Sequence, residues 1–250
     1  MKNDVASLSQ WYQQLLGSKL AALECSQVAK ALPTMFGYYL AYLGEAPVSH
    51  CLDTSPILRR IVVNQNHPAQ QRVSTLHADY AELPFKSNSV DVLILQHVLE
   101  YNASPEAVLA DCWRSLIPEG YMIILGFNPI SLWGIRRLFT HKASSIPWSG
   151  KFLRMGTVKR YLDDLGCDII DTSSFFYRPP IHHSYWLDAL RFLEIIGQVC
   201  WPMCGAAYML VAKKKLVTLT PIKPRIPSFR EVLVKGVSRE QPTTRRESTK

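Results

Sequence analysis

The chain lacks the sequence patterns of several common protein classes. None of its six cysteines stands in a CxxC pair, and its 250 residues show no catalytic triad, cluster of metal ligands or GxxxxGK(S/T) phosphate loop. Zinc sites and redox-active dithiols use closely spaced cysteines, so we predict reduced, mostly buried thiols and no metal site. The His182-His183 pair has no third ligand nearby in sequence and is not expected to bind metal.

Signals for export or membrane insertion are also weak. Residues 1–17 carry polar and charged groups throughout and lack the apolar centre of a secretory signal, so we expect a cytoplasmic protein. Residues 195–212 hold no charge and precede three lysines, which puts them at the lower length limit of a membrane span. Glycines and a proline divide this segment into a helix end, a turn and a strand. No transmembrane span is therefore predicted.

Positive charge gathers at the C-terminal end. The net charge is +8, yet residues 1–212 hold 17 basic and 17 acidic side chains, whereas residues 213–250 hold 11 and 3. That last segment also contains four prolines and little apolar periodicity, so we predict a basic, largely disordered tail over residues 216–250. Such a tail either contacts nucleic acid or an anionic membrane through counterion release, or simply stays solvated.

The apolar pattern predicts a doubly wound α/β fold. Helical spacing over residues 5–32, ended by Pro33, indicates an N-terminal helical extension, residues 1–37. Apolar runs typical of buried parallel strands occur at residues 38–44, 60–64, 73–78, 90–96 and 121–127, and a last strand is expected at 206–213. A helix that starts at Pro105 separates two of these strands, as a parallel crossover requires. We predict about seven strands in one α/β domain, residues 38–215.

Polar residues follow two of the predicted strands. Asp79 comes just after the third strand, and Gln96 and His97 end the fourth. Ligands of open α/β sheets bind at the carboxyl ends of strands, and we expect these two loops to be neighbours. Asp79 suits an exocyclic amine, and Tyr80 offers apolar surface to a planar ring. His97 is either a substrate-facing general base or a buried imidazole with satisfied hydrogen bonds.

These residues lie in a run that resembles a known family. Residues 77–129 are similar to the central half of the class I S-adenosylmethionine-dependent methyltransferases of the type 11 group. The matching positions include Asp79, Leu83-Pro84-Phe85, Ser89-Val90-Asp91, His97, Leu99-Glu100, Pro105, Leu109, Arg114, Leu116, Pro118 and Gly120. Later motifs, among them GFNPISLWGIRRLF and YRPP, resemble the YafS-like branch. The resemblance extends from about residue 38 to residue 225.

The resemblance implies a Rossmann-like, seven-stranded, mostly parallel sheet with helices on both faces and an antiparallel final strand. It also implies a methyltransferase that uses S-adenosylmethionine and acts on an unidentified acceptor. By position, Asp79 would bind the adenine amine with the backbone of Tyr80 beside it. Gln96 and His97 would line the methionine end. Gly44 would stand where the glycine-rich loop leaves the first strand.

Two departures from the family pattern affect the cofactor site. The usual acidic residue and GxGxG-type loop are replaced by AYLGEAPVSHCLDTS, with only Gly44. The second strand ends in Asn64 instead of a carboxylate that would hold the ribose. In a rival alignment, Asp53 would bind the ribose hydroxyls. Only eight residues separate Gly44 from Asp53, too few for both a helix and a strand, so we prefer Asn64 as the ribose ligand. The alternative function is a catalytically inactive binding or scaffold protein with a basic tail.

Two further segments have open interpretations. Asp91 is expected to fix the Ser89-Val90-Asp91 turn rather than contact a ligand. Residues 131–139, SLWGIRRLF, place apolar side chains opposite two arginines, which suits a lid over the substrate, core packing or an interfacial helix. Core packing or a lid is preferred to membrane contact.

Overall fold

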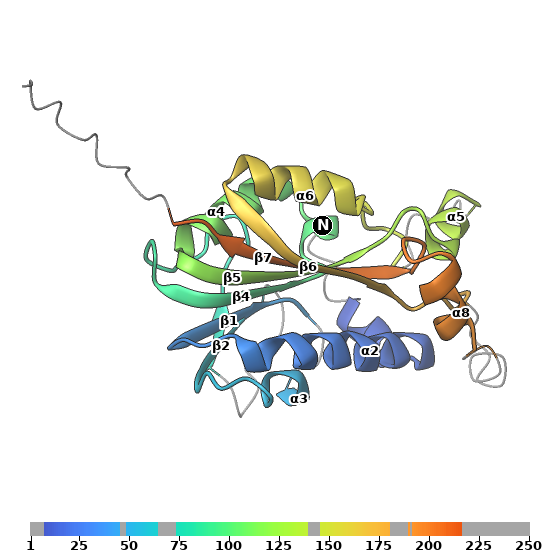
Figure 1. Ribbon diagram of the computed structural model, residues 1–250, viewed down its shortest axis with the longest axis horizontal. Helices are drawn as coiled ribbons and strands as arrows, with labels where there is room; N and C mark the ends of the chain where they lie inside the picture. Colours follow the sequence, from blue (N-terminus) through green and yellow to red (C-terminus); the bar gives the residue numbers. More distant parts are fainter. Residues whose placement is uncertain are drawn as a thin grey trace, which may run out of the picture. The chain divides into compact units, whose positions relative to one another are not determined.

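Seven strands form one sheet in the order β3-β2-β1-β4-β5-β7-β6 (Figure 1). The computed structural model describes residues 8–45, 49–64, 74–139, 146–180, 190 and 192–216. The strands are β1 (Tyr39–Leu43), β2 (Arg59–Asn64), β3 (Ser74–His77), β4 (Val90–Gln96), β5 (Leu116–Phe127), β6 (Cys167–Phe175) and β7 (Ala207–Lys214). β1 pairs in parallel with β2 and β4, and β7 pairs antiparallel with β5 and β6. The predicted fold class, including the antiparallel final strand, is confirmed.

Helices cover both faces of this sheet. They are α2 (Leu15–Ala31), α3 (Ser49–Leu52), α4 (Pro105–Ser115), α5 (Leu132–Phe139), α6 (Met155–Asp164) and α8 (Phe192–Cys200), with 3-10 turns η1 (Leu32–Thr34) and η2 (Leu99–Tyr101). All seven residues of β4 are buried, because alternate side chains enter two separate cores. Val92 and Ile94 pack with α2, whereas Leu93 and Leu95 pack with α4 and α6. α2 lies on the opposite side of the sheet from α4 and α6 (Figure 1).

The N-terminal helix differs from the continuous one predicted over residues 5–32. Residues 8–12 are helical, the chain turns at residues 13 and 14, and α2 begins at Leu15. A Cβ atom at Gly17 would lie 2.2 Å from the carbonyl oxygen of Trp11, so this tight turn depends on glycine. The turn lets Trp11 and Tyr12 pack into the core from a different direction than α2.

The prediction that the loops after β3 and β4 follow neighbouring strands of the sheet is wrong. β3 is the edge strand, and β2 and β1 lie between it and β4. Strand order depends on pairing between distant segments, and a list of strands in sequence does not contain it. The two loops nevertheless approach each other above the sheet, because Tyr80 reaches across to the end of β1, where its hydroxyl donates to Glu45 Oε1 at 3.3 Å.

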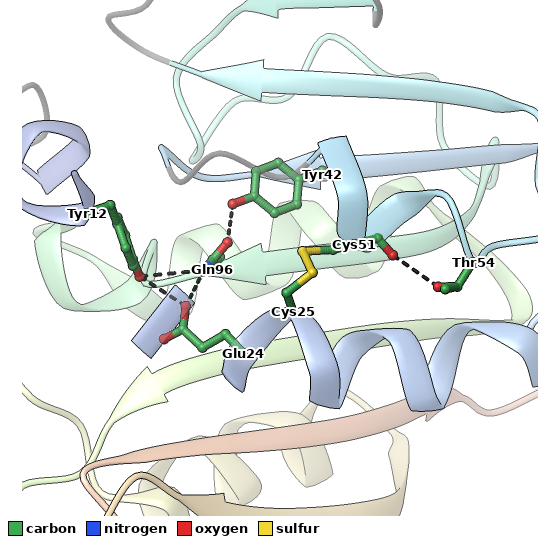
Figure 2. Close-up of a disulfide and its surroundings, with 7 residues drawn as sticks. All are labelled: Tyr12, Glu24, Cys25, Tyr42, Cys51, Thr54 and Gln96. Carbon is green, nitrogen blue, oxygen red and sulfur yellow. Dashed lines mark hydrogen bonds between the residues drawn. A yellow bond between two sulfur atoms is a disulfide. The ribbon is translucent and has the colours of Figure 1, made fainter. Parts of the chain in front are cut away.

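The prediction of reduced thiols is also wrong for one pair. Cys25 of α2 and Cys51 of α3 form a disulfide, with their Cα atoms 4.9 Å apart (Figure 2). They are 26 residues apart in sequence, and only the packing of α2 and α3 on the same side of the sheet brings them together. Cys112 and Cys167 are free and buried, as predicted, while Cys200 is free and exposed.

Several expectations concern absences or residues outside the described ranges. No helix in the described ranges has the length and apolar character needed to cross a membrane. Within those same ranges, no group of three or more His, Cys, Asp and Glu side chains is placed to hold a metal ion. The His182-His183 pair and the tail from residue 217 onward lie outside the described residues.

Candidate functional site

The carboxyl ends of β1 and β4 form the centre of the candidate site. Leu43 pairs with Leu95, so the residues that follow, Gly44 and Gln96, are adjacent. Gly44 has φ +153°, and a Cβ atom there would lie 2.9 Å from Tyr42 Oη and 3.0 Å from the carbonyl oxygen of Gln96. Glycine is therefore required where the chain leaves β1 beside the end of β4.

The Gln96 side chain joins two elements in a buried polar network (Figure 2). Its carbonyl oxygen accepts a hydrogen bond from the Tyr42 hydroxyl, and its amide nitrogen donates to Glu24 Oε2 of α2. The Tyr12 hydroxyl donates to the same Glu24 oxygen at 3.1 Å. The N-terminal helical segment thus supplies polar groups to the end of β4, where buried amides need partners.

His97 is held between two glutamates. Its Nε2 lies 2.7 Å from Glu24 Oε1, and its Nδ1 lies 3.1 Å from Glu100 Oε1. The imidazole ring stacks on Phe127 with 3.9 Å between ring centroids. His97 has φ +51°, an uncommon value for a residue other than glycine, so its backbone conformation is maintained by these contacts.

The charge state of His97 follows from these neighbours. Complete burial lowers the pKa of His97, but Glu24 and Glu100 more than offset this effect and raise the pKa to about 10. The ring is therefore an imidazolium at neutral pH, with both N–H groups directed at carboxylates. Such a ring has no free lone pair, so this geometry favours the buried, satisfied imidazole over the general base.

Of the two predicted site residues that follow β3, Tyr80 reaches the end of β1 and Asp79 does not. Asp79 is exposed, and its carboxylate accepts a hydrogen bond from the backbone N–H of Ala81 at 3.0 Å, an ordinary turn contact. Tyr80 is buried and lines a cavity of about 20 Å³ together with Gly44, Gln96 and His97. Four of the six predicted site residues therefore surround one small cavity.

Asn64 ends β2 and is buried at 5% exposure. Its Oδ1 has no hydrogen-bond donor within the described part of the chain. A buried acceptor without a donor is costly, so this atom is suited to a donor from a ligand. Asp53, the rival candidate, lies before β2 and is exposed. It forms an ion pair with Arg60 of β2, with 2.9 Å between Asp53 Oδ1 and Arg60 Nη1.

Asp91 has a structural role, but not the predicted one within the Ser89-Val90-Asp91 turn. Its carboxylate accepts hydrogen bonds from the backbone N–H groups of Tyr38 and Tyr39, at 3.0 and 2.8 Å. The residue thereby fixes the start of β1 against β4, far from the cavity at the opposite ends of these strands.

Sequence reasoning missed Glu24 and Tyr12 and assigned no role to Glu100. Glu24 lies in a buried stripe of α2 between Leu20 and Val28, four residues to either side. A carboxylate on the apolar stripe of a helix is the signal that could have identified it, because buried charges are paired in folded proteins. Nothing in the sequence indicated which residue its partner would be.

Comparisons with known proteins identify the family of the chain. A family model described as a methyltransferase domain matches residues 35–124. The uncharacterized protein YafS of Escherichia coli (strain K12) is 30% identical over 195 residues, which cover 76% of this chain and 74% of YafS.

Solved structures show the same fold. A SAM-dependent methyltransferase from Archaeoglobus fulgidus is 18% identical, with a TM-score of 0.56, and the match covers 77% of this chain and 94% of that one. The [4+2]-cyclase SpnF is 13% identical, with a TM-score of 0.54 and coverage of 77% and 80%. Because these two neighbours differ in reaction, the likeness establishes the fold alone.

Proposed function

Because the chain belongs to the YafS-like branch of the type 11 class I methyltransferases, we propose that it transfers the methyl group of S-adenosylmethionine to an acceptor. The bound cofactor supplies an electrophilic methyl group on a sulfonium. The acceptor's lone pair would form the new bond to the methyl carbon, the electron pair of the broken carbon–sulfur bond would stay with sulfur, and an O–H or N–H acceptor would release its proton to water. The protein contributes alignment and exclusion of water.

One observation carries the proposal. The carboxyl ends of three adjacent strands bring together Asn64 of β2, Gly44 just after β1 and Gln96 of β4. Gly44 leaves backbone without a side chain beside the end of β4, which permits close approach of a ligand. The unpartnered Oδ1 of Asn64 suits a ribose hydroxyl donor. These three residues therefore fit a ligand that joins a nucleoside to an amino acid, as S-adenosylmethionine does.

The remaining predicted residues extend this site. The buried Tyr80 ring is proposed to stack on adenine. The exposed Asp79 is proposed to accept a hydrogen bond from the adenine amine with the carboxylate oxygen that Ala81 does not contact. Gln96 and His97 line the methionine end. Two carboxylates around one imidazolium leave a net negative charge there, which favours a sulfonium cation.

His97 is proposed as a positioning residue. Its ring is buried and bonded at both nitrogens, so it contributes by fixing the end of β4 and by its charge. A base role would require Glu24 to withdraw from Nε2. That change is conceivable only if the N-terminal helical segment moves.

Cofactor entry does require such movement. The cavity beside Gly44 measures about 20 Å³, whereas sites for small molecules measure roughly 300–1,000 Å³. Leu8 forms one of its walls and Tyr12 bonds to Glu24, so the helical turn at residues 8–12 acts as a cover. We infer that cofactor binding displaces this turn.

Calorimetry with S-adenosylmethionine tests the proposal directly. We expect saturable heat at micromolar to millimolar cofactor. Absence of heat at millimolar cofactor would favour the second candidate, a binding protein without catalysis. The small cavity and the Glu24 contacts to Gln96 and His97 are the observations that favour that candidate.

Location and partners remain proposals as well. A cytoplasmic protein with an anionic partner for its basic tail is the proposal made from the sequence. The Cys25–Cys51 disulfide bears on the location, because cytosolic thiols are normally kept reduced. Alkylation of the protein inside intact cells, followed by mass measurement, separates a stable disulfide from a pair of thiols.

A further inference from the structure

A second and much larger cavity lies between α5 and α8, which are side by side at one end of the sheet (Figure 1). Its volume is about 540 Å³, within the range of small-molecule sites. The side chains that form it are mainly aliphatic and aromatic, among them Ile130, Leu132, Ile135, Leu193, Ile196 and Trp201.

Both hydroxyl groups in the cavity wall are already bonded within the protein. The Ser131 hydroxyl donates to the carbonyl oxygen of Asn128 at 2.7 Å. The Tyr177 hydroxyl donates to the carbonyl oxygen of Pro202 at 3.0 Å. A polar ligand would lose its hydration here and find no hydroxyl donor in exchange, whereas a hydrocarbon loses nothing. The wall therefore selects an apolar occupant.

The cavity begins close to the proposed methyl-transfer site. Phe127 ends β5 and stacks on His97, and the cavity wall starts two residues later at Pro129, about 7 Å along the chain. Trp133 of α5 is fully buried and stacks on Phe127, so α5 packs against the same aromatic ring that His97 contacts. An extended molecule that reacts beside the carboxyl end of β4 can therefore have its remainder in the cavity.

The charges beside the cavity are positive in sum. α5 carries Arg136 and Arg137 and no acidic residue. The one charged residue of α8 is Glu194, which pairs with Arg178 at 3.2 Å. Neither guanidinium lines the cavity, because Arg136 donates to the carbonyl oxygen of Pro180 and Arg137 Nε donates to that of Trp148 at 3.1 Å. The excess positive charge of α5 beside the cavity complements an amphiphile with an anionic polar end.

We propose that the cavity between α5 and α8 binds the hydrocarbon chain of an anionic, amphiphilic methyl acceptor. The assignment to an acceptor rests on the proposed methyltransferase function, whereas chain binding itself does not. Burial of an alkyl chain is favourable by roughly 0.8 kcal/mol per CH₂ group, so several methylene groups suffice for measurable affinity.

Thiol footprinting tests the site with decanoate as the probe. Cys204 lines the cavity and is half-buried, whereas Cys200 is exposed and does not line it, which makes Cys200 an internal control. We expect millimolar decanoate to slow alkylation of Cys204 at least fivefold and to leave Cys200 unchanged. Butyrate, and decyltrimethylammonium at equal concentration, should protect much less. Equal rates with and without decanoate would overturn the proposal.

A pair of variants distinguishes cavity binding from general adsorption. Ile196 lines the cavity and is 43% exposed, and Ile170 of β6 is 56% exposed and outside it. Ile196→Glu should abolish protection of Cys204, whereas Ile170→Glu should retain it; circular dichroism checks that both fold. Protection that survives in Ile196→Glu would contradict the proposal.

Other occupants would give different patterns. Equal protection of both cysteines by phosphatidylglycerol vesicles, without protection by decanoate, would indicate a lipid surface and overturn the proposal. Protection that rises with protein concentration alone would indicate a second copy and also overturn it. Calorimetry with S-adenosylmethionine distinguishes failure of the two proposals. Cofactor heat without protection of Cys204 removes the chain site alone. Protection without cofactor heat removes the methyltransferase function and the assignment of the ligand as a methyl acceptor, but not chain binding.

Discussion

Glu24 and His97 form an ion pair across 73 residues of sequence, with 2.7 Å between Glu24 Oε1 and His97 Nε2. Both side chains are almost completely buried. The pair joins the N-terminal helical segment to the end of the central strand, at the place where the methionine end of the cofactor is proposed to bind. Its strength therefore governs both the fold and access to the site.

Glu24→Gln should destabilise the protein by about 3 kcal/mol, because removal of one partner leaves the buried imidazolium with half of its compensation. The urea midpoint of unfolding measures this. Glu82→Gln is the matched control, since Glu82 is exposed; its effect should stay within about 0.5 kcal/mol. Equal midpoints for the two variants would contradict a structural role for the pair.

Stability should fall as pH rises above neutrality. The pKa of His97 is raised from 6.5 to about 10 in the folded protein, so protonation stabilises the fold fully below pH 6.5 and the gain is lost as pH rises through 10. The loss amounts to roughly 3–5 kcal/mol. Urea titrations at several pH values measure it. His97→Gln should lack most of this slope, and an unchanged slope would show that other groups cause it.

Reduction of the Cys25–Cys51 disulfide should lower the free energy of unfolding by about 3 to 4 kcal/mol, the chain-entropy value for a separation of 26 residues. Unfolding with and without a phosphine reductant measures the difference. Cys25→Ser should show the same loss and no further response to reductant. Cys200→Ser, which alters an exposed free thiol, should behave as the wild type.

The local elements were accessible from sequence because their signals are local. β4 has the predicted bounds at residues 90–96, since a buried parallel strand is apolar at every position. α4 begins at Pro105, where the Ser-Pro-Glu start predicted it. The end of the N-terminal helix at Pro33 was similarly readable, although the turn before Leu15 was not.

Contacts between distant segments were not accessible in the same way. The order of β3, β2, β1 and β4, the Cys25–Cys51 disulfide and the Glu24–His97 ion pair each depend on how preformed elements pack. Gln96 was identified because strand ends of a parallel sheet share one edge, whereas Gly44 and Asn64 were assigned through the resemblance to the family. Glu24 was missed because its helix precedes the sheet and crosses its face.

Asn64→Asp should tighten S-adenosylmethionine binding about five- to tenfold, because a carboxylate accepts stronger, charge-assisted hydrogen bonds from ribose hydroxyls than an amide does. Asn64→Ala should weaken binding, since the acceptor is removed. Calorimetry measures both. The matched control is Asp53→Asn, which alters only a surface ion pair with Arg60 and should leave cofactor affinity unchanged. If Asp53→Asn weakens binding and the Asn64 variants do not, the ribose is held by Asp53, and the proposed role of Asn64 at the end of β2 is wrong.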